Sequence, residues 1–384
     1  MFEFLRRQAP EQKASATAPV VAYASGGRVA WSPRDVVSLT KTGFAGNPVG
    51  YRCVKMIAEA ASALPLVMDG AVGEFAVHPV QDLLARPNVA QGRAELLEAL
   101  YAQLLLAGDG YVEAVGQEGL PVELHVLRSD RMRVVPGADG WPAGYEYSVG
   151  GRKHRFDAAL GRVLHVRNFH PQDDHYGFSP LQAAATAIDV HGAASRWSKA
   201  LLDNAARPSG AIVYKSADGQ GSLTSDQYDR LVGEMEMHHQ GARNAGRPML
   251  LEGGLDWKPM GFSPSDMEFQ KTKEAAAREI ALAFGVPPML LGIPGDATYA
   301  NYQEAHRAFF RLTVLPLATR VLARVAGWLS EMSGERLGVR PDLDQVTALS
   351  AERDAQWARV MGADFLSAAE KRQMLGLPSE AVHE

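Results

Sequence analysis

The densest group of residues with chemical potential lies between His165 and His175. This segment reads His165-Val166-Arg167-Asn168-Phe169-His170-Pro171-Gln172-Asp173-Asp174-His175. Its imidazoles and carboxylates are common metal ligands. If His165 ends a strand, the five-residue step to His170 puts the two side chains on opposite faces, and Pro171 then breaks the regular backbone. Three interpretations are open: a metal site, which would serve a metal-dependent hydrolase, a polar loop, or a contact surface for a partner.

Other signals of catalysis are weak. The sequence has no Gly-x-x-x-x-Gly-Lys-Ser/Thr phosphate-binding loop, which argues against ATP hydrolysis by that route. Ser179 follows Gly177 without the second glycine of a nucleophile elbow, and with Gln182 it fits a helix N-cap instead. Cys53, the single cysteine, lies in an apolar helical pattern, where a thiol is usually buried and unreactive. We therefore expect no catalytic residue, no metal and no cofactor.

Composition and charge narrow the class of protein. The 384 residues are 46% hydrophobic and 22% charged, which is typical of a folded chain with two or three units. The net charge of -5 argues against a protein that grips nucleic acid by neutralising many phosphates, but it suits one through which DNA slides. Arg320 and Arg324 interrupt the longest apolar region, Leu312 to Leu329, so we expect no membrane span. The start of the chain does not fit a secretory signal, and one cysteine suits a reducing cytoplasm.

Helix and strand signals alternate in the first half of the chain. Asn47 followed by Pro48 predicts a helix through Ser62, and a second helix is expected over 91–107. Strands are expected over 63–68, 111–115, 122–127, 131–135 and 163–166. Residues 31–178 therefore read as an α+β unit, whereas residues 1–30, rich in Ala, Ser, Gly and Pro, indicate a flexible arm.

Two long helices with a small unit between them follow. The first begins at the Ser179 cap and is expected to run to about Ala206. The second begins at Ser263, which forms an S-x-x-D capping arrangement with Asp266, and it ends where Gly285 can take a left-handed conformation. The region between them predicts a strand over 210–215, a helix over 224–239 and a hairpin over 248–260.

The last third of the chain is predicted to be helical. Pro287 and Pro288 prevent the second long helix from continuing, and a further helix with Pro316 near its centre should bend there. Residues 341–384 predict two more helices, the second starting at a capping box of Ser367 and Glu370.

Several of these segments resemble the portal proteins of tailed bacteriophages with lambda-like capsids. Glu279 to Gly292 matches the family pattern E-I-A-x-x-F-G-V-P-P-x-x-L-G, and residues 177–181 match its G-x-S-P-L segment. Residues 208–212 and 246–254 also match in kind and order. The length of the chain is similar to that of portals from prophages and gene transfer agents.

The resemblance implies a portal-like α+β fold with named parts. These parts are a flexible N-terminal arm over 1–30, an α+β wing over 31–178, stem helices over 179–206 and 262–284, an inserted αβ clip over 207–261, a tunnel loop over 285–298, a kinked wing helix over 299–333 and a helical crown over 334–384. The implied function is structural and not enzymatic: a ring of identical subunits, expected to be dodecameric, at one vertex of the capsid.

The resemblance also implies partners and a location. Double-stranded DNA would be packaged and ejected through the ring, terminase would dock on the clip, and the major capsid protein and the head-to-tail connector would be further partners. The subunit would be assembled in the bacterial cytoplasm and end in the virion. A head-to-tail adaptor is an alternative, although adaptors are usually shorter and lack two long helices around an inserted unit.

Two groups of residues are candidates for contact with DNA. By resemblance the tunnel loop is a passive gate that contains Gly285, Val286, Pro287, Pro288, Met289, Leu290, Leu291 and Gly292, with the Met and Leu side chains presenting apolar bulk. In the second stem helix, Lys271, Lys273 and Arg278 could face DNA. Alternatively, the mixed charges of that helix form a solvated face or pair with neighbouring copies, because the sequence does not tell which face points inward.

Overall fold

The computed structural model describes most of the chain from residue 32 onward. The described residues are 32–70, 73–74, 78–116, 119–203, 210–214, 224, 226–227, 229–230, 233, 255–259, 269–294 and 299–377. The predicted arm, the Ser263 cap, most of the predicted clip and the end of the predicted tunnel loop lie outside these residues. Residues 32–384 form one compact unit by their contacts.

Two helices form the centre of the core. Helix α2 (Pro48–Ser62) begins where the sequence predicts, because the Asn47 side chain accepts hydrogen bonds from the backbone N–H groups of Val49 and Gly50. Helix α4 (Arg93–Ala107) packs along α2 and ends at Gly108, which takes a left-handed conformation. The shorter α1 (Val36–Leu39), a π-helical turn (Thr40–Ala45) and α3 (Pro79–Ala85) complete this region.

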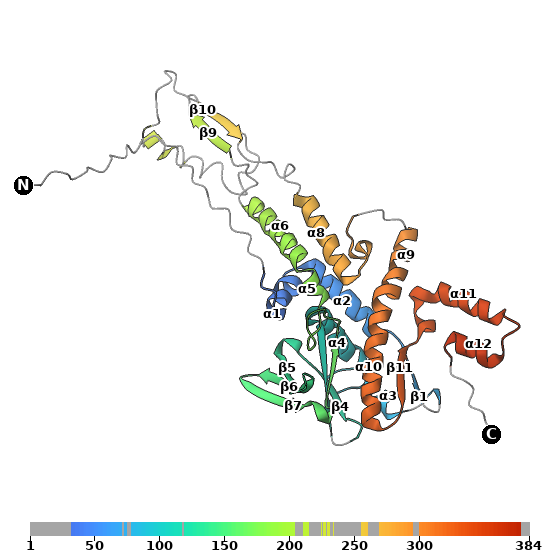
Figure 1. Cartoon of the computed structure of the whole chain (residues 1–384). Helices are drawn as coiled ribbons and strands as arrows, with labels where there is room; N and C mark the ends of the chain where they lie inside the picture. Colours follow the sequence, from blue (N-terminus) through green and yellow to red (C-terminus); the bar gives the residue numbers. More distant parts are fainter. Residues whose placement is uncertain are drawn as a thin grey trace, which may run out of the picture. The chain divides into compact units, whose positions relative to one another are not determined.

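Two antiparallel three-stranded sheets follow α4. In the first, β3 (Asp109–Val115) lies between β4 (Glu123–Leu127) and β8 (Val163–Arg167). The second is a meander of β5 (Met132–Pro136), β6 (Pro142–Val149) and β7 (Arg152–Asp157), visible on one side of the unit in Figure 1. The sequence predicted β3, β4, β5 and β8 to within two residues at each end, but it did not predict β6 and β7. A separate apolar cluster of Tyr111, Leu127, Met132, Val134 and Tyr145 joins the two sheets.

A third sheet pairs residues that are far apart in the sequence. Strand β1 (Leu66–Gly70) lies between β2 (Gly73–Glu74) and β11 (Leu337–Pro341), with Leu66 opposite Pro341 and Met68 opposite Val339. Strand β11 was not predicted. Its pairing ties the beginning of the predicted crown to the beginning of the predicted wing.

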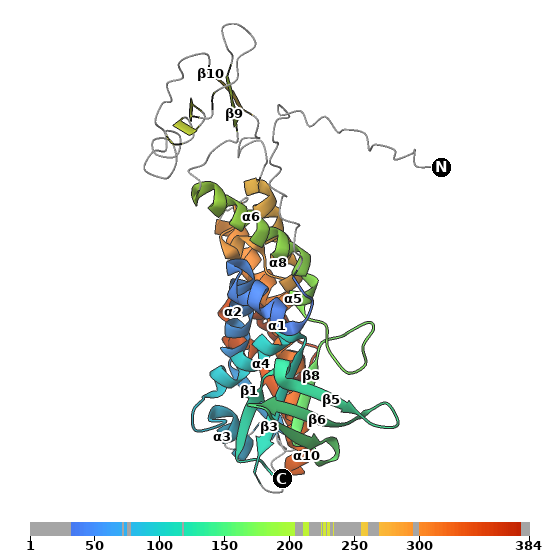
Figure 2. The same ribbon diagram turned by 90° about the vertical axis from the view of Figure 1, so that its left-hand side faces the viewer.

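Two long helices lie side by side (Figure 2). They are α6 (Ala185–Asp203) and α8 (Phe269–Phe284). The Ser179 cap is present, since its hydroxyl accepts a hydrogen bond from the Gln182 N–H at 3.0 Å. The helix that it starts is not continuous as predicted, because α5 (Pro180–Ala183) ends at Ala184 and α6 begins after it. Within the predicted clip, the structure describes a pair of antiparallel strands, β9 (Gly210–Tyr214) and β10 (Leu255–Pro259).

The next helical stretch contains the predicted irregularity at Pro316. Helix α9 (Tyr299–Phe309) passes into a π-helical turn (Phe310–Val314) and then into α10 (Leu315–Ser333), with Pro316 in its first turn. The wider π turn accommodates a proline that has no N–H to donate. Residues 300–333 are long and apolar enough to cross a membrane by length and composition alone, but the core helix of a soluble protein meets the same test. Here Val321, Val325 and Leu329 belong to the main core.

The two helices predicted near the end of the chain are present. They are α11 (Ser350–Met361) and α12 (Ala368–Leu375), preceded by short 3₁₀ turns over Leu343–Gln345 and Thr347–Leu349. The predicted capping box of Ser367 and Glu370 starts α12, and Gly376 closes it with a φ of 74°. Arg353 on α11 donates to the Asp344 carboxylate at 2.6 Å and so anchors the pair to the preceding turn.

Candidate functional site

The turn after α8 is held by a specific network. Gly285 has a φ of 67°, which ends the helix in the way the sequence predicts. The Val286 N–H donates to the Ala281 carbonyl, and the Thr313 hydroxyl donates to the Gly285 carbonyl at 2.6 Å. A Cβ at Gly285 would lie 2.8 Å from the Thr313 hydroxyl oxygen. The beginning of the predicted tunnel loop is therefore fixed to the π turn before α10.

The rest of the described loop folds back on itself. Pro288–Leu291 form a 3₁₀ turn that Gly292 closes with a φ of 70°. Val286 is buried, and Leu290 and Leu291 pack against the main core. We predicted that Met289, Leu290 and Leu291 present apolar bulk to a channel. The side chains of Leu290 and Leu291, however, are partly buried against the core of their own chain. The gating role of the loop stays a prediction. The start of the loop, at Gly285 and Val286, is held in place by hydrogen bonds.

The three candidate cations of α8 do not share one face. Lys271 and Arg278 are seven residues apart and exposed, so they lie on the same side of the helix. Lys273 is two residues from Lys271, about 200° around the helix axis, on the side of the buried Ala277 and Ile280. A single DNA-facing surface can therefore contain Lys271 and Arg278, but not Lys273 as well.

Lys273 is close enough to α6 for its charge to influence His191. Burial and, to a smaller degree, the positive charge of Lys273 lower the pKa of His191, a buried residue of α6. The His191 ring lies 3.3 Å from the side-chain amide of Asn47. Further along the same pair of helices, the rings of Trp197 and Phe269 stack with centroids 3.7 Å apart.

Arg278 is also tied to the loop. Its guanidinium donates a hydrogen bond to the backbone carbonyl of Pro294. The residue therefore holds the described end of the loop against the exposed side of α8. A guanidinium carries five N–H groups, so Arg278 could still donate hydrogen bonds to DNA through the N–H groups that do not bind Pro294.

The segment 165–175 has a structural role in this fold: its first three residues end β8 and the rest form a loop. The His165 ring stacks on Tyr111 with centroids 4.3 Å apart, and its Nε2 lies 2.8 Å from the Asp109 carboxylate. Asp173 accepts backbone hydrogen bonds from His175 and Tyr176. Within the part of the chain that the structure describes, no three His, Cys, Asp or Glu residues are arranged to hold a metal ion. The geometry gives no support to a metal-dependent hydrolase.

The sequence analysis did not identify Asp109 as a residue that holds this loop in place. Its carboxylate accepts the Gly177 N–H at 3.0 Å in addition to the contact with His165. Arg320 on α10 donates to the Arg167 carbonyl and to the Asn168 side chain, at 2.8 and 2.7 Å. These bonds fix the loop before α5 to two elements that are distant in the sequence, β3 and α10, and only the fold brings the partners together.

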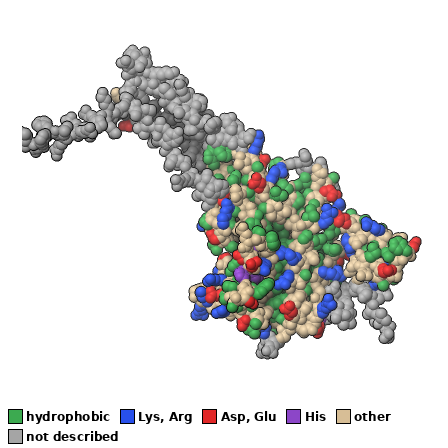
Figure 3. Space-filling view, viewed as in Figure 1, with side chains coloured by type: hydrophobic (Ala, Val, Ile, Leu, Met, Phe, Trp, Pro, Cys, Tyr) green, Lys and Arg blue, Asp and Glu red, His purple; other side chains and the backbone are tan. Residues whose placement is uncertain are grey.

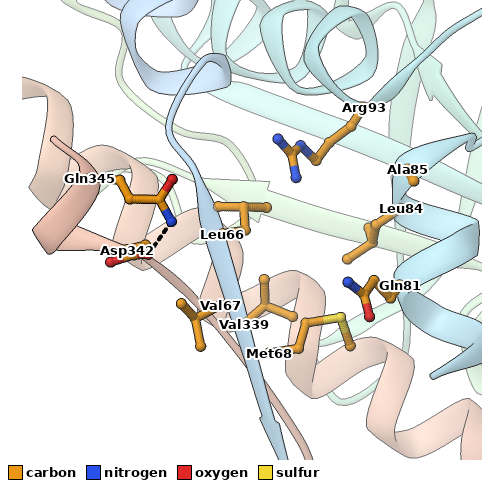
Figure 4. A pocket seen from close by; sticks show the side chains of 10 residues that line it. All are labelled: Leu66, Val67, Met68, Gln81, Leu84, Ala85, Arg93, Val339, Asp342 and Gln345. Atoms are coloured by element: carbon orange, nitrogen blue, oxygen red, sulfur yellow. Dashed lines mark hydrogen bonds between the residues drawn. The ribbon is translucent and has the colours of Figure 1, made fainter. Parts of the chain in front are cut away.

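A cavity of about 290 Å³ lies between β1, β11 and α3 (Figure 4). Its walls combine apolar side chains such as Leu66, Leu84 and Val339 with the polar groups of Arg93 and Asp342. Gln345 donates to the Asp342 carboxylate at 2.6 Å. No nucleophile paired with a base lines this cavity, so it does not have the arrangement of a catalytic pocket.

The comparisons with known proteins point to one family. The family model described as "Phage portal protein" matches residues 48–376. The chain belongs to the phage portal protein family. A chain of the neck of an empty GTA particle is 69% identical, with a TM-score of 0.74, and the match covers 95% of this chain and all of that one. The neck of the native GTA particle, computed with C12 symmetry, has a chain that is 68% identical over 95% of this one, with a TM-score of 0.71.

More distant relatives show the same family. The portal protein of Enterobacteria phage HK97 is 25% identical over 325 residues, which cover 81% of this portal and 74% of that protein. An HK97-family phage portal protein from Corynebacterium diphtheriae, 17% identical, shares the fold with a TM-score of 0.58 over 85% of this chain and 99% of that one. The portal-like α+β fold expected from the sequence is therefore confirmed.

Proposed function

We propose that this portal subunit forms a ring at one capsid vertex of a gene-transfer-agent type of particle, through which double-stranded DNA enters and leaves. The observation that carries this proposal is the 68–69% identity, over nearly the whole chain, to chains of GTA necks. One of those necks was computed with C12 symmetry, which supports a ring of twelve copies. The portal itself catalyses no reaction, and the location is the virion after assembly in the bacterial cytoplasm.

The helix pair α6 and α8 is proposed as the stem. Lys271 and Arg278 on the exposed side of α8 contact the passing duplex, whereas Lys273 stays with His191 between the helices. Two such cations in each copy give a weak attraction, which suits a channel because each phosphate contact adds affinity that would slow sliding. The tunnel loop is a passive gate whose base is fixed by Gly285 and the 3₁₀ turn.

The remaining partners follow from the family. Terminase docks on the clip, 207–261, and supplies the force from ATP hydrolysis. The head-to-tail connector binds the same end of the ring, and the major capsid protein is a further partner. An adaptor is disfavoured, because the portal family model covers residues 48–376 of this chain.

Electron microscopy of the purified full-length portal tests the ring. We expect annular particles with a central hole and twelve-fold symmetry. A protein that stays monomeric at every concentration and in every particle fraction would overturn the proposal. Particles that carry K271Q together with R278Q should package or retain DNA differently from wild type, whereas K273Q alone should change stability but not DNA retention. The reverse result would reject the assignment of the DNA-facing side.

A further inference from the structure

The sheet of β5, β6 and β7 has one apolar face and one charged face. Met132, Val134, Tyr145 and Phe156 point to the cluster shared with Tyr111. Because side chains alternate along a strand, the residues between them point away from this cluster. The register places Arg133 opposite Glu146 and Glu146 opposite Arg155, so these three side chains form a row across the outer face.

The outer face has an excess of positive charge. The Lys153 ammonium, on the same face, lies 2.9 Å from the Glu146 carboxylate. A hydrogen bond from Lys153 and the charges of Lys153, Arg133 and Arg155 hold the pKa of Glu146 below its ordinary value. The exposed Asp157 lies two residues from Arg155 and therefore on the same face, so three cations share this face with two carboxylates, which leaves an excess of one positive charge.

Strand β7 extends this charge to the edge of the sheet. Its first four residues, Arg152, Lys153, His154 and Arg155, are all exposed, and among the described residues β7 pairs only with β6. In Figure 3, Lys and Arg side chains gather at the lower left, in the region where Figure 1 labels β5, β6 and β7. This concentration is notable in a chain whose net charge is -5.

We propose that this surface, defined by Arg133, Lys153 and Arg155, binds the phosphate backbone of duplex DNA outside the channel. The cross-strand rows Arg133–Glu146–Arg155 and Ser148–Lys153 are polar throughout. Protein–protein interfaces usually have an apolar centre, whereas interfaces with DNA are polar and strongly positive. The surface therefore fits a polyanion better than a second folded protein.

The contact would be independent of sequence. Exposed cations on a sheet face can neutralise phosphates but have no element that enters a groove to read base edges. The proposal requires duplex DNA outside the ring in a filled capsid, where a peripheral cationic surface would hold it. This proposal does not depend on which residues line the channel. It concerns the sheet of β5, β6 and β7 and DNA outside the ring, whereas the channel assignment concerns α8, the loop after it and DNA inside the ring.

Binding of closed circular plasmid DNA distinguishes the proposed outer surface from the channel. A closed circle has no end to thread through a ring, so binding of a plasmid to the intact full-length portal reports the outside surfaces. The test variant combines R133Q, K153Q and R155Q. A matched control combines K41Q, R86Q and R359Q, which removes the same charge from exposed positions on other elements.

We expect the test variant to lose most plasmid binding at 50 mM salt and the control to resemble wild type. Three phosphate contacts would make wild-type affinity fall by about 40-fold more than that of the variant between 50 and 200 mM salt. Equal plasmid binding by wild type and test variant would overturn the proposal. So would a variant that binds plasmid normally but is no longer incorporated into particles, since the surface would then serve an acidic protein.

Discussion

Substitution of Gly285 gives a stringent test of how the loop after α8 is fixed. An alanine there must adopt the left-handed φ of 67°, which costs roughly 1–2 kcal/mol for a residue with a side chain. Its Cβ would also lie 2.8 Å from the Thr313 hydroxyl oxygen, so Thr313 must move. Moving Thr313 weakens its 2.6 Å hydrogen bond to the Gly285 carbonyl, with a further loss of about 1 kcal/mol. We therefore expect G285A to destabilise the portal by about 2–3 kcal/mol, and G285V by more.

Gly292 provides the matched control. Its φ of 70° is nearly the same, but a Cβ there would meet no atom within 4 Å. The G292A variant should therefore lose only the conformational part, about 1–2 kcal/mol. Urea unfolding at one fixed subunit concentration measures both values, since the stability of an oligomer depends on concentration. Equal destabilisation by G285A and G292A would refute the role of Thr313.

The G285V variant tests the gate. Because Gly285 lies at the base of the loop and not within α6 or α8, G285V should reduce DNA packaging more than it reduces the number of rings seen by electron microscopy. Equal loss of packaging and of rings would count against the gating assignment.

Three further predictions concern the core. Burial raises the pKa of the Cys53 thiol to about 12, so iodoacetamide at pH 8 should label it only after unfolding, and stability should fall as the pH rises above about 9. The lowered pKa of His191 means that its contribution to stability is present above the unfolded pKa of about 6.5 and is lost as the pH falls below it. Urea unfolding at pH 7.5 and pH 5.5 should therefore show a smaller pH dependence for H191N than for wild type. G177A should destabilise the portal by about 3 kcal/mol or more in urea unfolding, because its Cβ would overlap the Gly108 carbonyl.

Each of these has an outcome that would contradict it. Rapid labelling of native Cys53 would mean that the thiol is accessible. An unchanged pH dependence in H191N would mean that other groups dominate between pH 5.5 and 7.5. A G177A protein as stable as wild type would show that the two glycine backbones can separate without cost.

The sequence predicted elements best where local chemistry determines them. Asn47 with Pro48, Ser367 with Glu370 and the glycine after Phe284 act on backbone groups within one turn, and each marks a helix end in the structure. The break at Ala184 escaped prediction because an alanine-rich segment favours an unbroken helix. From the sequence, Pro316 predicted only a bend in the helix. Proline lacks the N–H for one backbone hydrogen bond, but its presence does not tell whether the helix adjusts by a kink or by a π turn.

The missed parts depend on distant partners. Strand β7 carries Arg, Lys and His in succession, so it lacks the alternation of a half-buried strand, and the neighbouring β6 is what makes it a strand. The separation of Lys273 from Lys271 follows from helix geometry once α8 is known to pack on α6. The anchoring role of Asp109 has no local signal, because Gly177 is 68 residues away.

The pairing of β1 with β11 has a consequence for biosynthesis. Leu66 leaves the ribosome long before Pro341 exists, and at 5–20 residues per second the interval is about 15–55 s. During that time the edge of β1 that will pair with β11 is unpaired, so chaperones or other nascent chains can bind to it. Only a chain synthesised almost to its last helices can close this sheet, so a truncated polypeptide would arrive at assembly with its first strand still open.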